Sequence, residues 1–147
     1  MPHFGLMDEK ALGPVEGPLR RARLHVRGGK RRLRQGKIAA GVAALYDALS
    51  AAMQWYVALP ARREALAIGP ADDLGDDRSV HALLVRSGVL DGRFDLDSFA
   101  RLMEEERQQL SDHEQAELLA GLEAVMTQLG VMPFDEASLP PEDPGAF

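Results

Sequence analysis

The chain has 147 residues, of which 46% are hydrophobic and 27% are charged; this composition excludes wholesale disorder and favours one folded domain. It contains no cysteine, so disulfides and thiolate metal sites are excluded and a reducing, cytoplasmic environment is expected. The net charge of −6 conceals an uneven distribution, because nine cations and no acid lie between Arg20 and Lys37.

Residues 1–29 are predicted to form an irregular, basic arm. Proline and glycine recur as far as Pro18, which is typical of loops, and the first residues lack a basic region followed by an apolar run, so no signal peptide is expected. The stretch from Leu19 to Val26 is too short for its periodicity to distinguish a helix from a strand, and Gly28-Gly29 is expected to break it.

The strongest pattern is a heptad repeat, which predicts one long helix from about Lys30 to Leu59, ended by Pro60. Because alanines flank the repeat, neighbouring helices can approach from more than one side, and this helix is expected at the centre of a bundle. Asp47 lies within the apolar stretch, which argues against a membrane span. The repeat comprises Ile38, Val42, Leu45, Leu49, Ala52, Tyr56 and Leu59.

Two shorter helices are predicted next. After a connection at residues 60–75, the first helix follows a capping aspartate, Asp76 or Asp77, and ends before Gly88. The second helix covers roughly residues 96–110 and is also opened by an aspartate.

The last predicted helix begins at a capping box formed by Ser111 and Glu114, reaches Leu129 and is ended by Gly130. The tail after it is rich in proline, which excludes a helix or a central strand. Three apolar side chains of the tail are candidates to pin it to the bundle: Phe134, Leu139 and Phe147.

These elements predict an all-α fold: a compact bundle of four principal helices around one long Ala-rich central helix, with irregular N- and C-terminal segments. We expect a single domain over residues 1–147, with an arm at 1–29, a helical bundle at 30–130 and a Pro-rich tail at 131–147.

The dense positive charge is the principal functional candidate. Arginines spaced along a helix or arm bind phosphates and acidic partners, so the segment 20–37 is predicted to contact a protein or a nucleic acid. The alternative is an internal salt-bridge surface that faces the acidic clusters at 72–77 or 104–106. The candidate binding residues are Arg20, Arg21, Arg23, Arg27, Lys30, Arg31, Arg32, Arg34 and Lys37.

No pattern predicts a metal or a cofactor. The run His113-Glu114-x-x-Glu117 lacks the second histidine of a zinc-protease helix, and the capping box explains Glu114 without a metal. Tyr46 and Trp55 lie on the long helix, where aromatic residues usually belong to the core; a small-molecule pocket beside them is the alternative.

Residues 43–49, with the sequence AALYDAL, lie on a first long helix followed by shorter antiparallel helices, and this arrangement resembles the HEPN helical-bundle superfamily over residues 36–130. Members with ribonuclease activity carry an arginine, four to six residues and then a histidine. The resemblance implies Arg107 and His113 as candidate catalytic residues, but it departs from the family because a helix break is predicted between them.

The sequence therefore predicts a non-enzymatic helical-bundle binding protein that uses its basic N-terminal segment. A HEPN-like ribonuclease and a structural helical homo-oligomer are the alternatives. The leading prediction requires that the nine cations are not neutralised by the fold itself.

Overall fold

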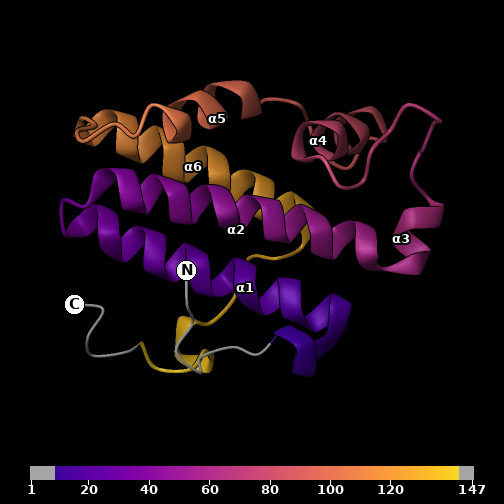
Figure 1. Cartoon of the computed structure of the whole chain (residues 1–147), viewed down its shortest axis with the longest axis horizontal. Helices are drawn as coiled ribbons and strands as arrows, with labels where there is room; N and C mark the ends of the chain where they lie inside the picture. The colour runs from indigo at the N-terminus through magenta and orange to yellow at the C-terminus, as the bar shows by residue number, and fades with distance from the viewer. Residues whose placement is uncertain (1–8, 143–147) are drawn as a thin grey trace.

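A computed structural model of the chain describes residues 9–142, which form six α-helices and one short 3-10 helix and contain no β-strand (Figure 1). The all-α fold class is therefore confirmed. The helices are α1 (Glu9–Arg34), α2 (Ile38–Ala58), α3 (Pro60–Glu64), α4 (Asp77–Arg86), α5 (Leu96–Glu104) and α6 (Asp112–Leu129), and the 3-10 helix is η1 (Glu136–Ser138).

Helix α2 is the centre of the bundle, as predicted, because each of the other five described α-helices packs against it. The first five residues of its heptad repeat are buried, whereas Tyr56 and Leu59 at its end are only half-buried. Alanines on the other sides of the helix are buried as well, which explains how so many neighbours reach one helix. The buried alanines outside the repeat are Ala44, Ala48 and Ala51.

The predicted irregular arm at residues 1–29 is wrong from residue 9 onwards, because α1 begins at Glu9. Proline and glycine were expected to prevent a helix throughout this region, but they alter the backbone only near residue 13. Gly13 has φ +86° and interrupts α1, and Pro14 then begins the continuous part of the helix, where its missing N–H has no helical acceptor to lose. Pro18 also lies inside the helix, near the start of this part.

Gly28-Gly29 does not break α1, because Gly29 serves close packing against α2. A Cβ atom on Gly29 would lie 2.7 Å from Leu45 Cδ2 and 3.2 Å from the carbonyl oxygen of Gly41. A Cβ atom on Gly41 would in turn lie 3.1 Å from the carbonyl oxygen of Gly29. The backbones of α1 and α2 therefore approach each other where both helices carry glycine.

The predicted helix from Lys30 to Leu59 is in fact the end of α1 and the whole of α2. The break lies at Gly36, whose φ of +76° closes α1. Its N–H donates to the carbonyl of Leu33, and the N–H of Lys37 donates to the carbonyl of Arg32, which is the Schellman pattern of helix ends.

The later helix boundaries agree with the sequence at their caps. The side chains of Asp76 and Asp95 accept backbone hydrogen bonds at the starts of α4 and α5, and Ser111 and Glu114 form the predicted capping box of α6. Gly130 ends α6 in a left-handed conformation with φ +90°.

Helix α5 ends at Glu104, not at residue 110 as predicted. Three successive glutamates, Glu104 to Glu106, stand at its end, where negative charge opposes the helix dipole. Glu106 has φ +51°, which turns the chain into the loop that leads to α6. Leu110 is still buried, but from this loop and not from a helix.

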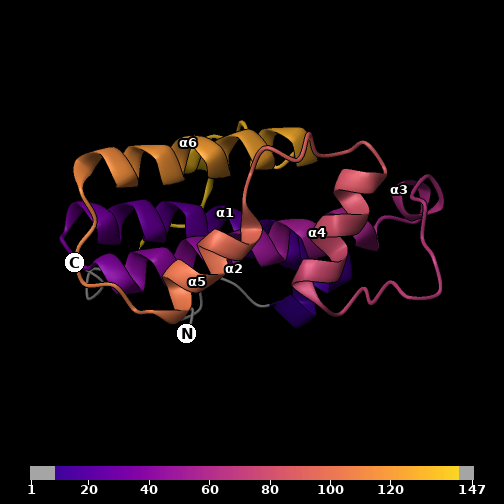
Figure 2. The ribbon, with the colours of Figure 1, turned by 90° about the horizontal axis from the view of Figure 1, so that it is seen from above.

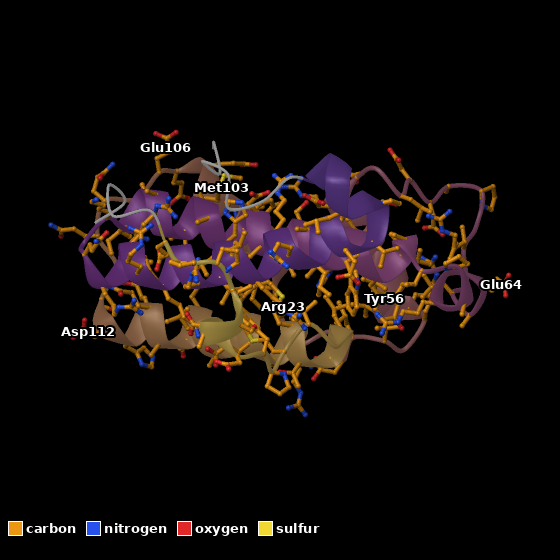
Figure 3. The ribbon with its side chains drawn as sticks, turned by 90° about the horizontal axis from the view of Figure 1, so that it is seen from below. Arg23, Tyr56, Glu64, Met103, Glu106 and Asp112 are labelled. Atoms are coloured by element: carbon orange, nitrogen blue, oxygen red, sulfur yellow. The ribbon has the colours of Figure 1, made fainter. Side chains whose placement is uncertain are left out.

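The C-terminal segment, residues 131–142, returns from α6 across α1 (Figures 1 and 3). Leu139 is buried against Leu24 and Phe134 packs beside them, which confirms the predicted anchoring by these two residues. Phe147 lies outside the described residues. One turn of the tail, η1, is helical, which the sequence analysis did not expect. No helix within residues 9–142 is long and apolar enough to cross a membrane.

Candidate functional site

The nine predicted binding cations lie on α1 and on the turn that follows it, and several of them meet carboxylates of the same chain. Lys30 Nζ lies 3.1 Å from Glu123 Oε1 on α6. Arg31 Nε donates to Glu142 Oε2 in the C-terminal segment over 2.5 Å, and only 5% of the Arg31 side chain is exposed. The fold therefore neutralises part of the basic segment internally.

A second set of internal contacts joins α1 to α2 at Asp47. Arg21 Nη2 donates to Asp47 Oδ1 over 2.6 Å, and His25 Nε2 lies 2.8 Å from Asp47 Oδ2. Burial raises the pKa of Asp47, but the hydrogen bonds and charges of His25 and Arg21 outweigh burial and lower this pKa to about 2. Asp47 is therefore a carboxylate at neutral pH.

Accessible positive charge is concentrated at the turn between α1 and α2, where Arg34 and Lys37 are exposed; Arg20, at the other end of the segment, is half-buried. Burial, together with the neighbouring charge of Arg31, lowers the pKa of Arg32. The segment between these ends is thus a packed helix face and not an open arm.

The acidic cluster at 72–77, one of the two internal partners that the sequence offers, is engaged elsewhere, and the glutamates at 104–106 are exposed. Asp72 Oδ2 accepts from Arg86 Nη2 over 2.6 Å, and Asp77 Oδ1 accepts from the Ser50 hydroxyl over 2.8 Å. Asp76 caps α4. Cations of the basic segment therefore do form internal salt bridges, but their partners are Asp47, Glu123 and Glu142 and not the predicted clusters.

Arg107 and His113 lie in the loop before α6 and in its first turn, next to carboxylates. Arg107 Nη2 is 3.6 Å from Glu114 Oε2, and His113 Nε2 is 3.2 Å from Glu117 Oε1. Nothing in this geometry tests the HEPN resemblance, which stays a prediction.

The described part of the chain contains no cluster of metal-binding side chains. Within residues 9–142, no three histidine, aspartate or glutamate side chains gather as ligands of a metal ion.

An apolar groove lies between α5 and α6. Both helices pack against α2, yet they lie apart from each other (Figure 2). The space between them is a cavity of about 510 Å³ that opens to the surface. Its apolar lining comes from α5, α6 and the loops at either end of α5, and comprises Phe94, Phe99, Leu102, Leu110, Leu118 and Val125.

Gly121 and Phe94 shape the wall of this groove. A Cβ atom on Gly121 would lie 3.0 Å from Phe94 Cδ1, so the absence of a side chain on α6 lets the Phe94 ring rest there. Phe94 meets Phe99 edge to face with ring centroids 5.6 Å apart, and Phe99 contacts Tyr46 of α2 at 5.3 Å. A continuous aromatic wall therefore connects the groove to the central helix.

The rim of the groove carries more negative than positive charge. A backbone hydrogen bond at Ser111 lowers the pKa of Glu114, and hydrogen bonds from Ser98 lower the pKa of Asp95, so both are ionised at neutral pH. Glu117 and Asp91 also line the groove, and the rim cation is Arg93, which lies 3.9 Å from Asp91.

The sequence did not indicate that residues of α5 and α6 would line a groove. The aromatic pair considered from the sequence does not form a shared pocket wall, because Tyr46 packs against Phe99 while the Trp55 ring lies under the guanidinium of Arg62 at 4.4 Å. One usable signal was Gly121, since glycine inside a helix costs about 1 kcal/mol relative to alanine and often marks a close approach.

Comparison of the chain with protein-family models, with curated proteins and with solved structures gives no match. The site must therefore be interpreted from its own geometry, which offers two surfaces: the partly covered basic face of α1 and the open groove between α5 and α6.

Proposed function

We propose that this chain is a non-enzymatic binding protein that receives an amphipathic, basic helix of a protein partner in the α5–α6 groove. One observation carries the proposal: the groove is apolar along its floor, open to solvent and edged by carboxylates. Helix-in-groove recognition uses this combination, in which apolar anchors fill the floor and charges on the rim fix orientation.

The length of the groove favours a helix as the occupant. Its lining on α6 extends from Glu114 to Gln128, which at 1.5 Å per residue is about 21 Å, or four helical turns. A partner helix of this length places side chains at positions i, i+4, i+7 and i+11 along one stripe. Such a stripe matches an elongated groove better than a compact ligand does.

The charge of the rim favours a basic partner. Asp95, which caps α5, lines the groove together with Glu114 and Glu117 of α6, and the rim has one arginine to oppose them. Complementary lysine or arginine side chains on the polar face of a partner would speed association and select its orientation. An acidic helix would meet like charges, which disfavour binding.

This proposal keeps the predicted partner binding but moves it from the basic segment to the groove. Part of the basic segment is already engaged within the chain, whereas the groove opens to the surface and Phe94, Leu102 and Leu118 in its lining are only half-buried. The ribonuclease and the homo-oligomer stay predictions.

Fluorescence anisotropy with a labelled peptide tests the proposal. The probe is a 15-residue helix-forming peptide with leucines on one face and lysines on the other. We expect a dissociation constant at least about tenfold lower than that of a scrambled peptide of the same composition, because only the ordered stripe fills the groove. A peptide with glutamate in place of lysine should bind more weakly than the lysine peptide and the scrambled peptide at low salt.

Two alanines of α6 provide a matched pair of variants. Ala124 lines the groove and Ala120 does not, yet both are exposed on the same helix. Ala124→Trp should weaken peptide binding at least about tenfold by filling the groove, whereas Ala120→Trp should leave it within about twofold. Equal affinities of these two variants, or equal binding of ordered and scrambled peptides, would contradict the proposal.

A further inference from the structure

The charges on the rim of the α5–α6 groove are distributed unevenly along its length. Glu114 and Glu117 belong to the first two turns of α6 and line one end of the groove, called the acidic end below. Gln128, in the last turn of α6, lines the other end. From Glu117 to Gln128 the helix rises about 16 Å, so the two ends of the groove face side chains about three turns apart on a partner helix.

The loop before α5 holds Arg93, the rim cation, away from the acidic end. On one side of Arg93 in the chain, the Asp91 N–H donates to Gln128 Oε1 over 3.0 Å, and Gln128 Nε2 donates to Asp91 Oδ2 over 3.2 Å. On its other side, Phe94 rests against Gly121, in the middle of α6. Because Gln128 and Gly121 mark the two limits of this loop segment, Arg93 lies beside the second half of α6.

Arg93 is accessible to a partner. Its side chain is 91% exposed, and its ion pair with Asp91 spans 3.9 Å. Asp91 also accepts hydrogen bonds from the Gln128 side chain and from the backbone N–H of Arg93, so its carboxylate is shared. A guanidinium has several donors in a fixed fork, and this one retains donors for a carboxylate of a partner.

The acidic end stays negative when its own contacts are included. Arg107 lies 3.6 Å from Glu114, and His113 lies 3.2 Å from Glu117. However, α5 ends and α6 begins at the same end of the bundle, and the exposed glutamates at 104–106 stand there as well (Figure 1). The groove therefore has a negative end at the start of α6 and an accessible cation beside its second half.

A partner helix has a favoured charge distribution of its own. Acidic side chains stabilise the first turn of a helix and basic side chains stabilise its last turn, because each opposes the partial charge of the helix dipole at that end. Such a helix matches the groove with its acidic first turn at Arg93 and its basic last turn at the acidic end. It then lies antiparallel to α6, and the reverse direction would bring like charges together at both ends.

From this charge distribution we infer that the groove binds its partner helix in one direction, antiparallel to α6, and that Arg93 selects an acidic side chain in the first turn of that helix. The inference rests on the proposed function and adds the direction and the charge order of the partner. Apolar side chains along the stripe supply affinity, whereas the charges at the two ends disfavour the reverse orientation.

Nitroxide labels on the chain measure the direction of a bound peptide. The chain has no cysteine, so Gln109→Cys and Thr127→Cys each carry a single label, near the start and the end of α6, at exposed positions outside the groove lining. The forward peptide has the leucine stripe, glutamates in its first turn and lysines in its last turn; the reverse peptide exchanges the two charged turns.

The two labels should act on opposite ends of the forward peptide. We expect the label at residue 127 to remove the amide NMR signals of its first turn and to leave those of its last turn, because the first turn lies towards Arg93. The label at residue 109 should do the opposite. With the reverse peptide, each label should affect the other end, because its lysines then lie at the first turn and again meet Glu114 and Glu117.

Arg93→Gln and a matched control, Arg78→Gln, test the selecting residue. Both arginines are exposed, but Arg78 does not line the groove. In fluorescence anisotropy, Arg93→Gln should weaken binding of the forward peptide about threefold, as expected for an exposed ion pair, whereas Arg78→Gln should leave it unchanged. A forward peptide with glutamines in place of its glutamates should not respond to Arg93→Gln, because the ion pair is then absent in either case.

Three results would overturn this inference while leaving the proposed function intact. The first is a forward peptide that binds better than its scrambled version but loses the same signals with either label. The second is one common direction for the forward and reverse peptides, which would mean that apolar packing sets the orientation. The third is equal weakening by Arg93→Gln and Arg78→Gln, which would assign the effect to net charge. A forward peptide that binds no better than its scrambled version would contradict the proposed function and the inference together.

Discussion

On the α1 side of the bundle, the chain's own C-terminal segment contacts Arg23, Arg27 and Arg31 of the dense basic block, whereas on the α5–α6 side an apolar groove lies open between two helices. The covered side is held by ion pairs with acids far away in the sequence. The open side exists because α5 has nine residues and α6 has eighteen, so the shorter helix cannot cover the longer one.

The difference teaches that local charge density is a poor guide to an accessible surface. Arg31 belongs to the densest part of the basic block and is almost fully buried, while Arg34, three residues later, is exposed. Apolar side chains behave in the opposite way here, because Leu118 remains only half-buried at the groove. Each contrast can be tested by making the same substitution at a buried position and at a more exposed one.

The largest effect is expected from shortening a leucine where α1 meets α2. Leu45 is fully buried below Gly29, so Leu45→Ala should lower the free energy of unfolding by about 3 kcal/mol, through lost burial and a cavity. Leu118→Ala in the groove should cost less than about 1 kcal/mol, because that side chain is already half-exposed. Urea denaturation measures both values; equal losses would mean that the groove is closed in solution.

The next contrast compares two arginines of α1. Arg31→Gln leaves Glu142 without its hydrogen-bond donor in a mostly buried position and should cost about 2 kcal/mol. Arg34→Gln changes an exposed side chain and should alter stability by less than about 0.5 kcal/mol. Thermal and urea unfolding of the pair provide the measurement. A cost for Arg34→Gln as large as that for Arg31→Gln would show that the C-terminal cover is not what distinguishes them.

The pH dependence of stability should report on Asp47. Its folded-state pKa of about 2 lies below its usual value of 3.8, so the ionised carboxylate stabilises the fold above about pH 4, and this contribution is lost as the pH falls towards 2. After allowance for its partial exposure, Asp47→Asn should reduce stability by about 1–2 kcal/mol at pH 7 and by less at pH 3.

Urea unfolding of the unaltered chain and Asp47→Asn at pH 7, 5, 4 and 3 tests this expectation. The two stability curves should converge at low pH, because protonation removes the same interaction that the substitution removes. Curves that stay parallel would exclude Asp47 as a source of the acid sensitivity.

Much of the fold was accessible from the sequence because its signals act locally. The caps at Asp76, Asp95 and Ser111 and the stop at Gly130 depend on residues within one helical turn. The central position of α2 followed from alanines on several faces, which is a property of the helix itself.

The errors in the fold arose where tertiary contacts decide. Gly29 indicated a break, but its role depends on Gly41 and Leu45 of another helix. Conversely, Gly36 does end a helix, but it lies inside a region of strong helical periodicity. Local propensity cannot distinguish a packing glycine from a terminating one, because only the partner helix differs.

The functional surfaces were harder to predict for the same reason. The carboxylate of Arg31 lies 111 residues away along the chain, so no pattern in the basic segment could reveal that it is covered. The groove was hidden by the predicted extension of α5 to residue 110, which would place a helix beside most of α6. Helix α5 instead ends at Glu104, and Leu118 of α6 is only half-buried where it lines the groove.

The smallest effect concerns the start of α6, at one end of the open side. Ser111→Ala removes the side-chain acceptor of the Glu114 N–H and should cost about 1 kcal/mol. Because Leu122 and Val125, deeper in α6, are buried in the core, the loss should be felt locally, as faster hydrogen exchange of the amides of Glu114 and Gln115, which both donate to Ser111. Ala116→Ser, an exposed change further along the same helix, should cost about 0.5 kcal/mol and leave that exchange unchanged. Faster exchange throughout α6 in Ser111→Ala would instead mean that the groove wall opens as one unit, and that its capping box governs access for a partner helix.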